Sequence, residues 1–146
     1  MTVYSGHVGP CAWSVVQGAL DDATIEGFLS YLRGVADDAA PGQLVLDMCH
    51  DLPMPTPVQR RRIIEVLNGS KKLDLVAGHA LVVNSTIGRG LLTAINWVVT
   101  PRFEEKLFAR PDQAFEWLAE RNPAFDADAL LAAVRAAHPG FDQLRW

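Results

Sequence analysis

The stretch from residue 79 to residue 118 constrains the possible folds most strongly, because breaks and caps divide it into four short elements. An apolar run at 79–83 is short enough for a buried strand and too short for an independent helix. Residues 84–98 begin with three polar N-cap candidates and then carry an apolar residue every three or four positions. Residues 106–109 have the pattern of a short strand, and a helical pattern opened by proline follows at 111–118. The stretch predicts strand, helix, strand and helix.

The rest of the chain continues this alternation. Residues 2–4 and 12–16 are strand-like and are separated by glycine and proline, which favours an antiparallel hairpin. An amphipathic helix follows at 21–35, and 44–46 is an apolar run of the kind found in strands covered on both faces. We therefore predict an α/β domain with a mixed, mostly parallel sheet of four or five strands and helices packed on it. Right-handed crossovers would place the loops after Leu46 and Val83 at one carboxyl edge.

The segment 47–57 leads to another helix and contains three prolines, which exclude regular structure and stiffen the loop. Thr56 is predicted to cap this helix, with Pro57 in the first turn and Gln59 completing a capping box. The apolar residues between 63 and 67 are expected to form its buried face.

A last helical pattern runs from an aspartate cap, Asp126, to about His138. It dominates a carboxyl-terminal extension, 122–146, that follows the main domain at 1–121. The sequence leaves open whether this helix packs on the same domain or against a second copy of the chain, so a homodimer is one of the expected assemblies.

Composition excludes several classes of partner. The chain is 49% hydrophobic and 21% charged, as in an ordinary globular protein, and its net charge of −4 disfavours binding to nucleic acid. Two cysteines are too few for a secreted disulfide framework and favour a reducing compartment. Neither a signal peptide nor an apolar run near the roughly 20 residues of a membrane span is visible. We expect a cytoplasmic protein without a membrane partner.

The strand LVLDM, followed by a loop and a helix about nine residues after the aspartate, resembles the STAS domain, a family that includes bacterial anti-sigma-factor antagonists. The phrases ALVVNS, GLLTAINW and KLFARPDQAFEWL are also similar to bacterial STAS/SEC14-like proteins, most of which lack an assigned function. The resemblance covers roughly residues 1–121. It implies a STAS-like layer of sheet and helices and a non-enzymatic signalling or protein-interaction module, with a kinase or sigma-factor regulator as the kind of partner.

The resemblance also implies site residues. In the antagonists, a partner kinase phosphorylates a serine at the start of the second helix, which switches binding off. By position Thr56 takes the place of that serine, and Asp47 matches the aspartate at the end of the preceding strand. Here Pro55-Thr56-Pro57 replaces the usual Asp-Ser-Ser-Gly, which changes what a kinase must recognise. Thr56 is thus a phospho-acceptor candidate, Asp47 its loop support, and Pro55 and Arg60 are candidate partner contacts. The alternative is that Thr56 only caps a helix and Asp47 only satisfies loop amides.

A second candidate site, for a small anion or a nucleotide, lies at Asn84, Ser85, Thr86 and Arg89. A helix start offers free amides, and hydroxyls and an arginine would add further donors. Gly88 would let a ligand approach closely. The alternative is a capped helix with a solvated arginine and a glycine that permits tight packing. The Gly-Lys-Ser/Thr ending of a phosphate loop is missing.

The sequence contains no clear catalytic signature. Cys49, His50 and Asp51 offer a nucleophile, a base and an orienting group, but adjacent residues rarely converge on one substrate atom. The four histidines show no paired spacing of metal ligands. We predict no enzyme activity, no metal and no cofactor, and keep a hydrolase built on Cys49 only as a formal alternative.

Overall fold

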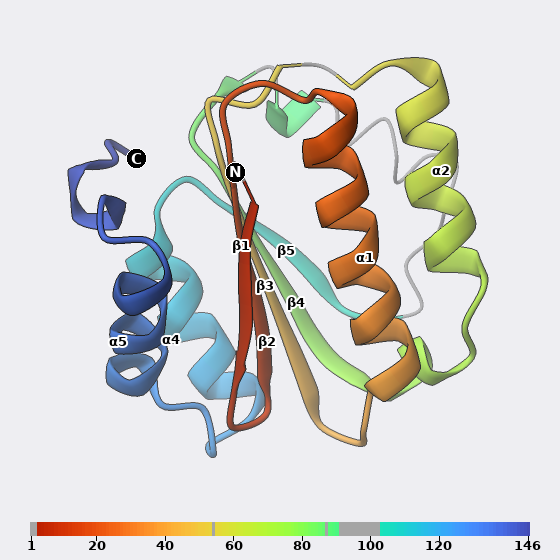
Figure 1. Cartoon of the computed structure of the whole chain (residues 1–146). Helices are drawn as coiled ribbons and strands as arrows, with labels where there is room; N and C mark the ends of the chain where they lie inside the picture. Colours follow the sequence, from red (N-terminus) through yellow and green to blue (C-terminus); the bar gives the residue numbers. More distant parts are fainter. Residues whose placement is uncertain (1–2, 54, 87, 91–102) are drawn as a thin grey trace.

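The computed structural model describes residues 3–53, 55–86, 88–90 and 103–146 (Figure 1). The strands of this part of the chain are β1 (Val3–Val8), β2 (Cys11–Gln17), β3 (Gln43–His50), β4 (Val76–Val83) and β5 (Glu105–Phe108). The helices are α1 (Asp22–Asp38), α2 (Pro57–Asn68), α4 (Pro111–Arg121) and α5 (Ala127–Ala137), with 3-10 turns at Lys72–Leu75 and Phe141–Gln143.

The described strands form one sheet in the order β1-β2-β3-β4-β5. β1 and β2 are antiparallel, and every other neighbouring pair is parallel. The predicted mixed, mostly parallel sheet is therefore confirmed. β1 is longer than the sequence predicts, because Gly6 does not interrupt it: a Cβ there would lie 2.8 Å from the Trp13 indole, so glycine lets the ring pack on the strand.

Helices cover both faces of the sheet, α1 and α2 on one side and α4 and α5 on the other (Figure 1). Side chains of β3 point alternately to the two sides. Leu44, Leu46 and Met48 are fully buried in the larger core with residues of α4 and α5, whereas Val45 belongs to a smaller cluster with Ala36 of α1. The larger core therefore lies between the sheet and the carboxyl-terminal helices.

α2 is attached more loosely than its sequence predicts. Its capping box forms as expected: Thr56 Oγ1 accepts from the Gln59 N–H at 3.2 Å, and the Gln59 side chain accepts from the Thr56 N–H at 2.9 Å. None of the residues of α2 is buried, however, and the expected buried face at 63–67 is at best half-buried. The helix packs against α1, where Arg62 pairs with Glu26, and this position leaves it little of the sheet to cover.

The carboxyl-terminal helix packs on the same sheet in this structure. α5 begins at its predicted cap, Asp126, and contacts β1, and its Leu130 is fully buried in the larger core. The last residues turn back to the end of β3, where His50 Nε2 lies 2.9 Å from the Arg145 carbonyl oxygen and the His50 ring packs edge-on against Trp146. The final segment is thereby tied to the centre of the sheet.

The helix predicted after β4 is described only at its start. Residues 86 and 88–90 are helical, and most of the apolar stripe expected between 87 and 98 lies outside the described residues. Among the helices that are described, we find none with the length and apolar character needed to cross a membrane.

Candidate functional site

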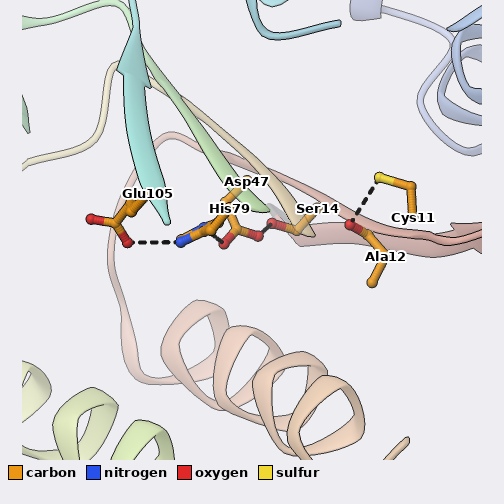
Figure 2. Close-up of polar contacts among 6 residues, drawn as sticks. All are labelled: Cys11, Ala12, Ser14, Asp47, His79 and Glu105. Atoms are coloured by element: carbon orange, nitrogen blue, oxygen red, sulfur yellow. Dashed lines mark hydrogen bonds and ion pairs between the residues drawn. The ribbon is translucent and has the colours of Figure 1, made fainter. Parts of the chain in front are cut away.

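A row of polar side chains crosses the sheet beneath α1. It takes one residue from each of four neighbouring strands: Ser14 from β2, Asp47 from β3, His79 from β4 and Glu105 from β5 (Figure 2). Ser14 stands opposite Asp47 in the β2–β3 ladder, and His79 stands opposite Glu105 in the β4–β5 ladder. We refer to these four residues as the polar row.

Hydrogen bonds connect the polar row without a break. Ser14 Oγ donates to Asp47 Oδ1 at 2.6 Å. His79 Nε2 lies 2.8 Å from Asp47 Oδ2, and His79 Nδ1 lies 2.8 Å from Glu105 Oε2. Carboxylate oxygens only accept hydrogen bonds, so both ring nitrogens must carry hydrogen and the ring is an imidazolium.

The surroundings of His79 favour this charged form. Burial lowers the pKa of His79, but the hydrogen bonds and negative charges of Asp47 and Glu105 outweigh that effect and raise it to about 10. The Asp47 carboxylate also acts on Tyr31 of α1, whose pKa is raised well above its usual range, first by burial and then by that negative charge. A positive ring between two carboxylates is the arrangement that lets charges remain inside a protein.

The polar row cannot act as a hydrolytic triad in this geometry. The Ser14 hydroxyl donates to the buried Asp47 carboxylate and not to a histidine, so the serine–histidine contact of a triad is missing. Both nitrogens of His79 are occupied by carboxylates, and a pKa of about 10 leaves the ring protonated near neutral pH. The arrangement suits a structural role at the centre of the sheet.

The structure corrects the role expected for Asp47. We expected it to end a strand and to support the loop before α2, but β3 continues to His50 and Asp47 is only 2% exposed. Its carboxylate bonds to Ser14 and His79 instead of loop amides. The other three residues of the polar row, Ser14, His79 and Glu105, were not predicted as site residues from the sequence. The sequence feature that could have revealed the polar row is the single polar residue within each of several apolar strands.

The loops after β3 and β4 meet at one edge of the sheet, as predicted. Asn84 Oδ1 accepts from the Asp51 N–H at 2.9 Å, and Asn84 Nδ2 donates to Asp51 Oδ1 at 2.8 Å. Asp51 has a φ of 51°, in the left-handed region that aspartate tolerates better than most residues. The Asn84 side chain thus links the two loops and does not cap the helix that follows it.

The remaining residues of the predicted anion site bond to one another. Ser85 is the actual cap, since its Oγ accepts from the Gly88 N–H at 3.0 Å. The Arg89 guanidinium turns back to Thr86 Oγ1 at 3.4 Å and to the Val83 carbonyl at 3.5 Å. A Cβ on Gly88 would lie 2.5 Å from the Val83 side chain, so glycine at this position allows the start of the helix to pack closely against the end of β4. These contacts match the alternative of a capped, tightly packed helix start.

The structure separates the residues of the predicted switch. Thr56 is exposed at the start of α2, whereas Asp47 lies inside the sheet. Pro55 is buried, which contradicts its expected role as a partner contact, because a buried side chain presents no surface. Arg60 is half-buried and its Nη1 lies 3.5 Å from the Pro55 carbonyl. Thr56 and Arg60 remain accessible, and so does Val58, which is 60% exposed.

The residues of the formal hydrolase do not converge. Cys49 and His50 are consecutive in β3, so their side chains point to opposite faces of the sheet. His50 is engaged by the carboxyl-terminal segment, and burial raises the pKa of the Cys49 thiol, which disfavours the reactive thiolate. Within the described ranges, no group of three or more histidine, cysteine or acidic side chains has an arrangement that could hold a metal ion.

Comparison with known proteins gives one informative match. No family model and no curated protein matches the chain. Among solved structures, an anti-sigma factor antagonist from Mycobacterium paratuberculosis superposes with a TM-score of 0.52 and 14% sequence identity, over 80% of this chain and 92% of that chain. Likeness at this identity concerns the fold alone. The strand order, the mixed sheet and this match together show that the chain has a STAS-like fold.

Proposed function

We propose that this chain is a non-enzymatic interaction module that presents α2 and the preceding loop to a protein partner. The observation that carries the proposal is that α2 buries none of its residues, although it exposes an apolar side chain, Val58, in its first turn. A helix that contributes little to the core of its own domain has its surface free for another protein. The name of the structural neighbour, an anti-sigma factor antagonist, supports a role in signalling.

The loop before α2 is fixed at both ends, which supports recognition by a rigid surface. Its start is tied to the next loop by the two hydrogen bonds between Asp51 and Asn84. Its end is anchored by buried Pro55. Thr56 is therefore held at an exposed and defined position, and a phosphate on it would lie at the positive end of α2. Such a group would change the charge of the surface offered to a kinase or a sigma-factor regulator.

A capture experiment tests this proposal. The immobilised chain is incubated with lysate of its host, and bound proteins are identified by mass spectrometry for the wild type, Val58→Asp and Thr56→Glu. Ala132→Asp is the matched control, because it places the same charge on an exposed position of α5. We expect the wild type and the control to retain one common partner and both α2 variants to lose it, with all four melting as folded proteins. Equal capture by all four would overturn the proposal.

No observation favours the anion site in the same way. Asn84, Ser85 and Arg89 each have a hydrogen-bond partner within the chain, so binding an anion would require these contacts to be exchanged. Calorimetric titration of nucleotides and simple phosphates against the wild type and Arg89→Ala tests this alternative. Absence of heat at millimolar ligand would remove it.

A further inference from the structure

The two edges of the described sheet differ in their protection against pairing. β5 has four residues, and two of them, Glu105 and Lys106, are charged, which are features that discourage association at an edge. β1 has six residues, VYSGHV, without proline, lysine, arginine or an acidic residue, and its ladder with β2 contains no bulge. β1 therefore lacks the usual devices that keep an edge strand from pairing.

The hairpin turn determines which main-chain groups of β1 point outward. Val8 and Cys11 flank a two-residue turn and are ladder partners, so they exchange both main-chain hydrogen bonds. Hydrogen-bonded pairs then alternate along the ladder. The N–H and C=O groups of Val3, Ser5 and His7 consequently point away from β2. The Ser5 and His7 side chains are exposed as well.

We propose that β1 is the interface of a two-fold symmetric homodimer, in which the β1 strands of two copies pair antiparallel and join their sheets. Directly opposite residues of an antiparallel ladder have their side chains on the same face of the sheet. In a symmetric pair of strands, this condition is met only if the two-fold axis passes through a residue and not through the peptide bond between two residues. An axis at Ser5 sets Ser5 opposite Ser5 of the second copy and Val3 opposite His7. This register uses all three outward-pointing residues, whereas a shift to Gly6 leaves Val3 without a partner in the strand.

α1 gives this interface a second layer. The helix packs over both β1 and β2, and a Cβ on Gly27 would lie 3.7 Å from the Val3 side chain. Two-fold pairing would set the two α1 helices about two strand spacings apart, roughly 10 Å, which is close to the distance between packed helices. The exposed positions 23, 27, 30 and 34 share one stripe of α1 and are alanine, glycine, serine and glycine. No bulky side chain on that stripe keeps a second copy away.

The absence of charge on β1 also explains why the partner is another copy of this strand. In the Ser5-centred register, serine faces serine and histidine faces valine, so pairing opposes no like charges despite the net charge of −4. The interface is separate from α2, so the homodimer does not depend on the proposed capture of a signalling partner.

Charge substitution at Ser5 tests the proposal by sedimentation velocity across the micromolar range. We expect the wild type to sediment as a dimer, and Ser5→Lys and Ser5→Glu to dissociate at concentrations at least tenfold higher, since each sets like charges directly opposite. An equimolar mixture of the two should recover the dimer, which a folding defect could not produce. Gln113→Lys on α4 is the matched control and should stay dimeric.

A disulfide assay checks the register. Hydrogen-bonded antiparallel partners have Cα atoms about 5.5 Å apart, within the range of a disulfide. Oxidised Ser5→Cys should therefore form a covalent dimer, whereas His7→Cys, which would face Val3, should not. A wild type that remains monomeric throughout the range, or a lysine–glutamate mixture that fails to associate, would overturn the proposal.

Discussion

The polar row predicts that the stability of this protein falls as the pH rises from about 6.5 to about 10. In the folded chain His79 keeps its proton up to a pKa of about 10, whereas in the unfolded chain it loses the proton near 6.5. Below 6.5 both states hold the proton, and the full contribution of the ion pairs is present. Above 6.5 the unfolded chain binds fewer protons than the folded chain, so the free energy of unfolding decreases with pH.

The size of the effect follows from this difference of one proton. A single proton changes the free energy of unfolding by about 1.4 kcal/mol per pH unit once the unfolded histidine is mostly neutral. Between pH 7 and pH 8 we expect a loss of about 1 kcal/mol from His79. Burial also raises the pKa values of the Cys11 and Cys49 thiols, but their losses begin only near the ordinary value of 9.0. Burial lowers the pKa of His138, which acts in the opposite direction and mainly below 6.5. In the interval from 6.5 to 8, His79 is therefore the largest contributor among the groups with shifted pKa values.

Urea unfolding at half-unit steps over that interval measures the effect. The wild type is compared with His79→Gln, which cannot titrate, and with Gln113→Ala, a substitution at an exposed position of α4, as a control. The Gln113 variant should retain the wild-type slope, and the His79 variant should lose about 1 kcal/mol per pH unit of it. If His79→Gln does not fold, the ring resonances of wild-type His79 give the answer, since they should stay those of an imidazolium at pH 8. A neutral ring at pH 8, or equal slopes in all three proteins, would refute this reasoning.

Three further predictions concern stability. Ser14→Ala should lower the free energy of unfolding by about 1–3 kcal/mol, because it removes one buried hydrogen bond to Asp47. Asp47→Ala should lower it by about 3–5 kcal/mol, because it leaves the buried imidazolium of His79 with one carboxylate partner fewer. Urea titration measures both changes. Thr56→Ala should cost about 1 kcal/mol through the lost cap, seen as a lower midpoint, and an unchanged midpoint would contradict the cap. Gly88→Ala should destabilise by about 1–3 kcal/mol because the new methyl meets the last side chain of β4, whereas Gly34→Ala, with open space in α1, should stabilise by up to about 1 kcal/mol in the same melts.

Local patterns were sufficient to predict most of the fold. The caps at Thr56 and Asp126 and the short apolar strands depend on neighbours in sequence, so the elements they define could be recognised without the structure. Strand length was harder to predict. Gly6 suggests a break in the sequence, but it continues β1 because Trp13 packs on it, and that contact depends on the pairing of two strands.

The candidate site was predicted less well, because its residues meet only after the sheet forms. Asp47 and His79 are 32 residues apart, and either alone resembles a polar residue at a strand end. Pro55 lies in a loop that should be exposed, and the structure buries it. The exposure of α2 was also missed, since its amphipathic pattern indicates a buried face but not how much of the sheet other helices leave uncovered.

The polar row has a consequence for how the chain finds one fold among similar ones. Strands made only of β-branched residues and leucine can pair in several registers at similar energy. In this sheet, a register shift of one residue would move a charged side chain to the other face, where it would lie in the larger apolar core. A slip of two residues would keep the face and break the chain of hydrogen bonds between Ser14, Asp47, His79 and Glu105. The four residues therefore penalise every wrong alignment of β2, β3, β4 and β5. Replacing all four by apolar residues of similar size should give a collapsed protein with several alignments, visible as multiple amide resonances for single residues of the sheet.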